Sequence, residues 1–213
     1  MRIVQPRIQI IDRINGEAML KKLEKIGRVS HKSEGKITVN SSRQFVRRLI
    51  KSGHESVLEH ISITVKIICD RGISHEIVRH RIASYTQEST RYCAYQEGIE
   101  IILPDIIKNN RQNKKIFLKT IREIEKTYQD LLANGVPPEI ARNILPHCLK
   151  TEIYCTFNLR EWRHIFFLRC ARDAHPQIRE IFIKILQKFQ QKIPIVFDDF
   201  EVDEEENVAY QLF

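Results

Sequence analysis

The segment from Ile61 to Asp70 carries apolar side chains at every second position, with Ser62, Thr64 and Lys66 between them. Successive side chains of a β-strand point to opposite faces of its sheet, so a period of two predicts a half-buried strand. The fold must therefore contain a sheet with one covered face, and this requirement restricts the architecture more than any other feature of the chain.

Other segments place their apolar residues at the helical period of 3.6. Residues 113–134 and 176–190 carry long stripes of this kind, and residues 18–26, 41–51, 73–82, 138–145 and 159–170 predict shorter helices. Gly53 and Gly135 are expected to end the helices before them. Strands are predicted at 151–158 and at 2–14, where Pro6 divides either one edge strand or two short strands. No repeat or linker marks a boundary, so residues 1–213 predict a single α/β domain of the α+β type.

Bulk composition narrows the class of protein. No apolar run approaches the ~20 residues that span a bilayer, and residues 1–13 lack the apolar core of a signal peptide. The five cysteines form no CxxC pair, which indicates reduced thiols, and we expect a cytoplasmic protein without a membrane partner. The acidic segment 198–206 is expected to be exposed. The net charge of +8 fits either a lysine-rich surface or an anionic partner.

The stretch from Arg79 to Tyr92 is the most informative one chemically. It places three arginines, several small hydroxyl residues and two tyrosines within fourteen positions, and residues 84–92 show no apolar period. This pattern predicts a loop that follows a helix. Guanidinium groups bind phosphate through paired hydrogen bonds, and hydroxyls and loop amides complete such a cradle. The alternative is a solvated helix end followed by a turn, and composition alone does not name a ligand.

Two other motifs are excluded by their spacing. His75 and Glu76 suggest the zinc-protease motif HExxH, but the second histidine, His80, falls five residues after the first, and Arg79 occupies the required position. At 3.6 residues per turn, these two histidines point away from a common face. The glycines match neither GxGxxG nor GxxxxGK[ST], so a dinucleotide would have to be held in another way. We expect no metal site.

The same stretch matches the pattern RHRxxSxxxxSxRY and so resembles the flavin-dependent thymidylate synthases. Further segments resemble that family in the same order along the chain. They are Gly27–Ser30, Gly53–Ser56 with Glu59-His60, Gly135–Pro137 with Ala141-Arg142 and Leu145-Pro146, and the block from Asn158 to Arg179. The resemblance implies a mixed sheet flanked by helices, assembled as a homotetramer with flavin sites where subunits meet.

The resemblance also implies roles for individual residues. Arg91 and Arg142 would hold the phosphate of dUMP, and Arg169 would reach the uracil ring as the catalytic residue. A cation beside the uracil imide favours its charged form, which raises electron density at C5. The full set implied for dUMP is Glu76, Arg79, Gln87, Glu88, Ser89, Thr90, Arg91, Arg142 and Arg169. The set implied for FAD is Ser56, Arg79, His80, Arg81, Gln87, Asn158, Arg160 and His164, of which Asn158, Arg160 and His164 would come from a neighbouring chain.

The implied reaction transfers a one-carbon unit from 5,10-methylenetetrahydrofolate to C5 of dUMP, with hydride from NADPH carried by FAD. Its products would be dTMP and tetrahydrofolate. Ser89 is expected to bind substrate, because a nucleophilic serine needs a general base that the sequence does not show. Glu76, Gln87 and Glu88 depart from the common family pattern. An ionised carboxylate only accepts hydrogen bonds, so we expect backbone amides of residues 88–90 to contribute more than these side chains.

Two rival interpretations remain at this stage. A basic nucleic-acid-binding module without catalysis would account for the net charge of +8 and predicts salt-sensitive binding without a chromophore. The chain has no RNP, KH or zinc-finger signature, so no nucleic-acid partner is expected. A catalytically inactive homologue is the other interpretation, and arginines at every matched position argue against it.

Overall fold

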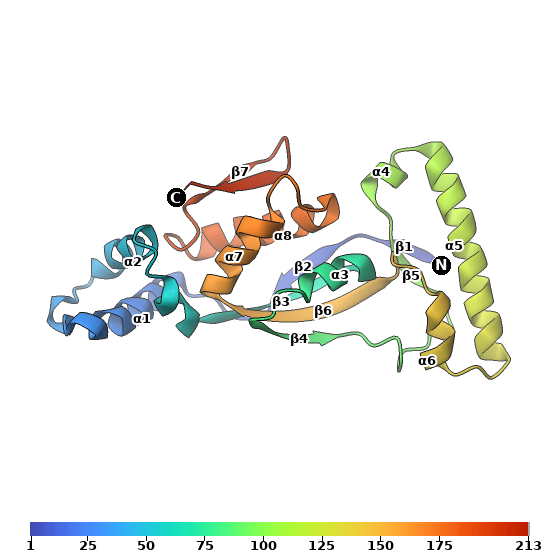
Figure 1. The fold of residues 1–213 in the computed structure, drawn as a ribbon, viewed down its shortest axis with the longest axis horizontal. Coiled ribbons are helices and arrows are strands. Elements are labelled where there is room, and N and C mark those ends of the chain that lie inside the picture. The colour runs from blue at the N-terminus through green and yellow to red at the C-terminus, as the bar shows by residue number, and fades with distance from the viewer. Residues whose placement is uncertain (213) are drawn as a thin grey trace. The chain divides into compact units, whose positions relative to one another are not determined.

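The computed structural model of the chain describes residues 1–212 (Figure 1). Its strands are β1 (Arg2–Val4), β2 (Arg7–Ile10), β3 (Ser62–Asp70), β4 (Ala83–Gln87), β5 (Glu100–Ile102), β6 (Lys150–Asn158), β7 (Phe200–Asp203) and β8 (Val208–Gln211). Its α-helices are α1 (Gly16–Arg28), α2 (Ser41–Lys51), α3 (Arg71–Ile77), α4 (Asp105–Lys108), α5 (Arg111–Ala133), α6 (Pro138–Ala141), α7 (Leu159–Arg169) and α8 (Pro176–Lys192). Short 3-10 helices include η3 (Glu55–His60) and η4 (Arg142–Ile144). The expected mixed α/β architecture is confirmed.

The strands form three sheets within the described residues. A four-stranded sheet has the order β2-β3-β6-β4, β1 pairs with β5 in parallel, and β7 and β8 form an antiparallel hairpin. The predicted alternation is confirmed in β3, where Ile63, Val65, Ile67 and Cys69 are all buried. The polar face of β3 also makes a side-chain hydrogen bond to β6, since the Oγ1 atoms of Thr64 and Thr156 lie 2.9 Å apart.

The chain divides into two compact units. Unit 1 contains Met1–Arg7, Lys66–Arg81 and Tyr85–Tyr154, and unit 2 contains Ile8–Val65, Ile82–Ser84 and the residues from Cys155 onward. In unit 1, the long helix α5 covers β5 through a core of Ile99, Ile101, Ile121 and Leu149. Gly135 ends α5 as expected, because its positive φ of 80° lets the amides of Gly135 and Val136 bond the carbonyls of Leu132 and Leu131.

Unit 2 is built around the aromatic face of α7 and α8. Trp162 is fully buried, its ring centroid lies 4.7 Å from that of Phe157 and 5.0 Å from that of Phe189, and its indole nitrogen donates to the carbonyl of Ile63 at 3.2 Å. The predicted stripe of α8 is confirmed, because each of its members is buried. Edge-to-face ring pairs add specificity to the burial of this apolar surface.

Three expectations about local structure were wrong at least in part. Residues 84–87 of the expected loop 84–92 belong to strand β4, and α3 ends at Ile77, earlier than expected. The pattern failed for β4 because its more buried positions are Ala83, Tyr85 and Gln87, which carry no hydrophobic period. The acidic segment 198–206 is also not uniformly exposed, since Asp199 and Phe200 are 3% exposed and residues 200–203 pair with β8.

Among residues 1–212, no helix has the length and apolar character needed to cross a membrane.

Candidate functional site

The arginine-rich segment begins where α3 ends. Asp70 caps the start of this helix by accepting a hydrogen bond from the amide of Ile73 at 2.8 Å. At the other end, the hydroxyl of Tyr85 lies within hydrogen-bond distance of the carbonyl oxygens of Ile77 (2.8 Å) and His80 (2.6 Å). A helix end leaves its last carbonyls without partners inside the helix, so Tyr85 fixes the turn that carries residues 79–81.

This turn presents two guanidinium groups to the surface of unit 1. Arg79 and Arg81 are exposed, whereas His80 between them is 6% exposed and Glu76 is half-buried. Guanidinium groups suit phosphate oxygens because they offer paired donors. Arg79 and Arg81, which are expected to contact the flavin, are therefore accessible, and His80 forms the inner side of the turn. Because α3 ends at Ile77, His80 also lies beyond the helix that carries His75.

Gln87, at the end of β4, is held by two hydroxyl groups of unit 1. Its side-chain nitrogen lies 2.8 Å from Oγ of Ser74 and 3.1 Å from Oγ1 of Thr151. Ser74 and Thr151 are both fully buried. Gln87 therefore ties β4 to α3 and β6, and the side-chain amide serves this purpose where the common family pattern has a different residue.

Glu88 belongs to a charge network inside unit 1. Its Oε1 accepts a hydrogen bond from the hydroxyl of Tyr95 at 2.7 Å, and its Oε2 lies 3.2 Å from Nζ of Lys150. Lys150 also pairs with Glu152 at 2.8 Å and Glu100 at 3.7 Å, and its side chain is 13% exposed. The carboxylate of Glu88 thus has internal partners, and the presence of Lys150 accounts for a carboxylate at this position, where the common family pattern has another residue.

The network shifts the proton affinities of its members. Burial acts to lower the pKa of Lys150, but the hydrogen bonds and charges of Glu152 and Glu88 outweigh it and raise that pKa. The hydrogen bonds of Lys150 and Lys66 lower the pKa of Glu152. Burial, together with the hydrogen bond to Glu88, raises the pKa of Tyr95. These groups keep their ordinary charge states at neutral pH, so the network acts as a fixed support for the loop that follows Gln87.

The loop of residues 88–92 brings several expected dUMP-binding residues together with α6 and η4. Nη1 of Arg142 lies 3.4 Å from Oγ1 of Thr90, and Nε of Arg91 lies 3.0 Å from a carboxylate oxygen of Glu139. The amide of Glu88 donates to Glu152, but within residues 1–212 the amides of Ser89 and Thr90 have no acceptor. The two amides and the guanidinium groups of Arg91 and Arg142 are donors from which an anion-binding cradle can be built.

Ser89 itself is positioned as part of this loop. Its hydroxyl oxygen accepts a hydrogen bond from the amide of Arg91 at 3.2 Å, as is typical of a serine that stabilises a turn. No carboxylate, imidazole or amine of the described chain hydrogen-bonds its hydroxyl. A serine nucleophile needs such a base within reach, so the geometry favours a binding role.

The remaining expected residues lie in unit 2, on η3 and α7. Asn158 caps α7 by accepting a hydrogen bond from the amide of Glu161 at 2.8 Å. Arg160 and His164 stand one turn apart on α7 and are exposed, as is Ser56 on η3. Arg169 is half-buried in the last turn of the same helix. This set offers a hydroxyl, an imidazole and a guanidinium to an anionic ligand, a donor set that fits the diphosphate of a flavin dinucleotide.

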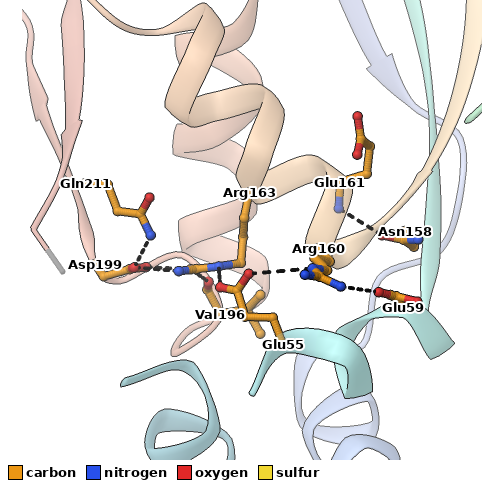
Figure 2. Close-up of polar contacts among 9 residues, drawn as sticks. All are labelled: Glu55, Glu59, Asn158, Arg160, Glu161, Arg163, Val196, Asp199 and Gln211. Atoms are coloured by element: carbon orange, nitrogen blue, oxygen red, sulfur yellow. Dashed lines mark hydrogen bonds and ion pairs between the residues drawn. The ribbon is translucent and has the colours of Figure 1, made fainter. Parts of the chain in front are cut away.

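One arginine of this region was missed by the sequence reasoning. Figure 2 shows Arg163 of α7 reaching Asp199 and Glu55, next to Arg160 and Glu59. Arg163 is 3% exposed and makes a two-bond contact with Asp199, with both distances 2.6 Å. Two features of the sequence could have pointed to this pair. Arg163 directly follows the apolar Trp162, and Asp199 stands only two residues after the apolar Phe197, within the acidic segment 198–206.

Comparison with known proteins identifies the family of the chain. Residues 11–195 match the family described as Thymidylate synthase complementing protein. The chain is 39% identical over 170 residues to the flavin-dependent thymidylate synthase of Pyrococcus furiosus, covering 78% of this chain and 70% of that protein. It is 35% identical over 166 residues to the flavin-dependent thymidylate synthase of Geobacter sulfurreducens, covering 77% and 72%.

A solved structure shares the fold. The UMP/dUMP methylase PolB from Streptomyces cacaoi, bound with 5-Br dUMP, superposes with a TM-score of 0.82 at 24% identity and covers 93% of this chain and 96% of that chain. The family match covers residues 11–195, and the relative from Pyrococcus furiosus is 39% identical over 170 residues. The chain therefore belongs to the thymidylate synthase complementing protein family, the flavin-dependent thymidylate synthases.

Proposed function

We propose that this enzyme makes dTMP from dUMP, taking a one-carbon unit from 5,10-methylenetetrahydrofolate and a hydride from NADPH. The methylene carbon forms a bond to C5 of the uracil as its two bonds to the folate nitrogens break, C5 loses its proton, and the hydride completes the methyl group. The folate nitrogens take up two protons, one to balance the proton lost from C5 and one from solvent. The products are dTMP, tetrahydrofolate and NADP⁺. Bound FAD would carry the hydride from NADPH to the one-carbon unit. The protein's part is to bind, orient and polarise the reactants.

The observation that carries this proposal is the cradle of residues 88–92. The unengaged amides of Ser89 and Thr90, together with Arg142 at 3.4 Å from Thr90 and the half-exposed Arg91, suit the near-dianionic phosphate of a nucleotide. Glu139 holds Arg91 in this structure and would be displaced or shared when phosphate binds. The bromo-dUMP in the PolB structure supports a uracil nucleotide as the ligand.

The uracil ring needs a second feature, a cation near its imide. Arg169 stands in the last turn of α7 and is half-buried, so its guanidinium is partly withdrawn from water, where a charge acts more strongly. In this proposal Arg169 stabilises negative charge that develops on the uracil and thereby raises the nucleophilicity of C5. Glu76 and the backbone amides of Ser89 and Thr90 complete the nucleotide contacts.

Flavin contacts come from two sets of residues in this proposal. The first set is Arg79, His80, Arg81 and Gln87 of unit 1, and the second is Ser56, Asn158, Arg160 and His164 of unit 2. The exposed guanidiniums of Arg79, Arg81 and Arg160 match the two phosphates of FAD. We propose a homotetramer in which the second set reaches the flavin of a neighbouring chain. Family membership favours this enzyme over a nucleic-acid-binding module.

Flavin content and complementation test the proposal directly. The purified protein should be yellow, its flavin absorbance should bleach with NADPH, and the gene should rescue a thymidine-requiring strain that lacks thymidylate synthase. Arg142→Ala should raise KM for dUMP at least about tenfold, because it removes one phosphate-binding guanidinium. Arg122→Ala, which removes an exposed arginine of α5, is the matched control. Failed rescue by a soluble, flavin-loaded wild-type protein would overturn the proposed reaction.

A further inference from the structure

Arg163 lies at the centre of the contacts between α7, η3 and the C-terminal segment (Figure 2). Its Nη1 donates to Oδ1 of Asp199 at 2.6 Å and to the carbonyl of Val196 at 2.5 Å, and its Nη2 donates to Oδ2 of Asp199 at 2.6 Å. Its Nε donates to Oε1 of Glu55 at 2.8 Å. Burial acts to lower the pKa of Arg163, but the hydrogen bonds and charges of Asp199 and Glu55 outweigh it and raise that pKa. The cation is therefore permanent.

Glu55 connects this buried cation to an exposed one. Its other oxygen, Oε2, lies 4.0 Å from Nε of Arg160, whose Nη1 lies 2.6 Å from Oε1 of Glu59. Arg160 and Arg163 stand three residues apart on α7 and so share one side of the helix. Nη2 of Arg160 makes no hydrogen bond or ion pair within residues 1–212, and half of its side chain is exposed. Ser56, next to Glu55, is exposed beside them.

The carboxylate of Glu55 contacts both arginines, but not equally closely. The hydrogen bond at 2.8 Å goes to the buried Arg163, and only the longer contact of 4.0 Å goes to Arg160. If Arg163 were absent, Glu55 would keep Arg160 as its nearest cation and would draw that guanidinium toward η3. An arginine that is bound by two carboxylates has less positive potential and fewer donors for a phosphate.

We propose that Arg163 is a positioning residue for flavin binding: it holds Glu55, and so leaves the guanidinium of Arg160 available to the flavin diphosphate. Asp199 takes part by fixing Arg163 through two hydrogen bonds, which links the C-terminal hairpin of β7 and β8 to the binding set on α7. This inference rests on the proposed flavin role of Arg160 and Ser56, and it assigns a task to a pair that no motif of the sequence contains.

The test uses a charge-neutral replacement of the buried pair. The double variant Arg163→Gln/Asp199→Asn removes one positive and one negative charge together, so the net charge is unchanged and Asp199 is not left as a buried carboxylate without its partner. Because Glu55 then turns to Arg160, the Kd for FAD should rise at least about tenfold, as expected from the strength of a close ion pair near a protein surface. Flavin-fluorescence quenching on apoprotein, with circular dichroism to verify folding, measures this without turnover.

A rescue variant separates positioning from general damage. Adding Glu55→Gln to the double variant should restore the Kd for FAD to within about threefold of the wild type, because the neutral amide no longer competes for Arg160. The matched control is Arg172→Gln/Glu206→Gln, which neutralises an exposed ion pair of 3.0 Å at the same hairpin and should leave the Kd unchanged.

The possible results distinguish this inference from the proposed function. Wild-type protein that binds no FAD would contradict the proposed function itself. Wild-type binding with an unchanged Kd in the folded double variant, or a weakened Kd that Glu55→Gln fails to restore, would overturn the role of Arg163 alone. If the double variant does not fold, Arg163→Lys replaces it, since lysine keeps a buried cation for Asp199 but has no second nitrogen for Glu55. Weakened binding that Glu55→Gln reverses is again expected, and unchanged binding again overturns the inference.

Discussion

Replacement of Lys150 by methionine tests whether the buried charge network supports the loop of residues 88–92. Methionine keeps much of the length of the lysine side chain but removes the charge. Three carboxylates, those of Glu88, Glu100 and Glu152, share this one cation at 3.2, 3.7 and 2.8 Å. Glu152 retains Lys66 after the change, whereas the carboxylate of Glu88 keeps, among residues 1–212, only the hydroxyl of Tyr95.

The expected loss of stability follows from the burial of these groups. Removing one partner of a fully buried ion pair costs about 3–5 kcal/mol. The carboxylates here are 17 to 32% exposed, so water relieves part of this penalty and we expect about 2–3 kcal/mol. For a chain of this size, each kcal/mol lowers Tm by about 2–4 °C, which gives a decrease of about 4–12 °C. KM for dUMP should also rise, because Glu88 anchors the loop that we propose binds the phosphate.

Differential scanning calorimetry measures this decrease at fixed protein and flavin concentration, because ligand binding and the association of subunits make Tm depend on concentration. Lys119→Met is the matched control, because Lys119 is 77% exposed and lies 3.9 Å from Glu123; its Tm should change by less than about 2 °C. Equal Tm values for the two variants would refute the idea that the network is a structural support. A lower Tm with an unchanged KM would confine its role to stability.

Three further predictions concern the rest of the molecule. Because the pKa of Glu152 is lowered by Lys150 and Lys66, its contribution to stability is present above its unfolded pKa of about 4.3 and is lost as pH falls through the lower folded value; Glu152→Gln should therefore flatten the acid limb of a stability–pH curve. Trp162→Phe should lower the free energy of unfolding by about 2–3 kcal/mol in urea titrations, because it removes a buried hydrogen bond and leaves a small cavity; a loss below about 0.5 kcal/mol would contradict this packing. Cys93 is exposed, whereas burial raises the pKa of Cys148 to about 11 and that of Cys155 to about 12, so a thiol reagent should label about one cysteine per native chain quickly, and Cys93→Ser should abolish that phase.

Much of the fold could be predicted because its helices and central strand bury continuous apolar faces. The stripe of α8 and the alternation of β3 are local patterns, and each predicted the buried side of its element. The segments whose structure was predicted wrongly have no such pattern. Strand β4 is rich in polar residues and contributes half-buried positions such as Tyr85 and Gln87, which are held by hydrogen bonds to α3 and β6.

The candidate site likewise has features that the sequence indicated and contacts that only the structure shows. The spacing of the arginines and hydroxyl residues indicated an anion-binding segment, and the family resemblance assigned the ligands. The structure adds the partners that keep these residues in place. Glu88 finds Lys150, which is 62 residues away, and Arg163 finds Asp199, which is 36 residues away. Nothing near Glu88 or Arg163 in the sequence identifies its partner.

By itself, then, the sequence determined the amphipathic elements and the family, and it predicted the chemical nature of the binding segment. These depend on residue type and short-range spacing, which a periodic backbone converts directly into faces and clusters. Tertiary structure alone decided that residues 83–87 are a strand, that Glu88 is an internal support and that Arg163 holds Glu55. Strand pairing and buried ion pairs join residues that are distant along the chain, so their free energy depends on a proximity that only the folded protein creates.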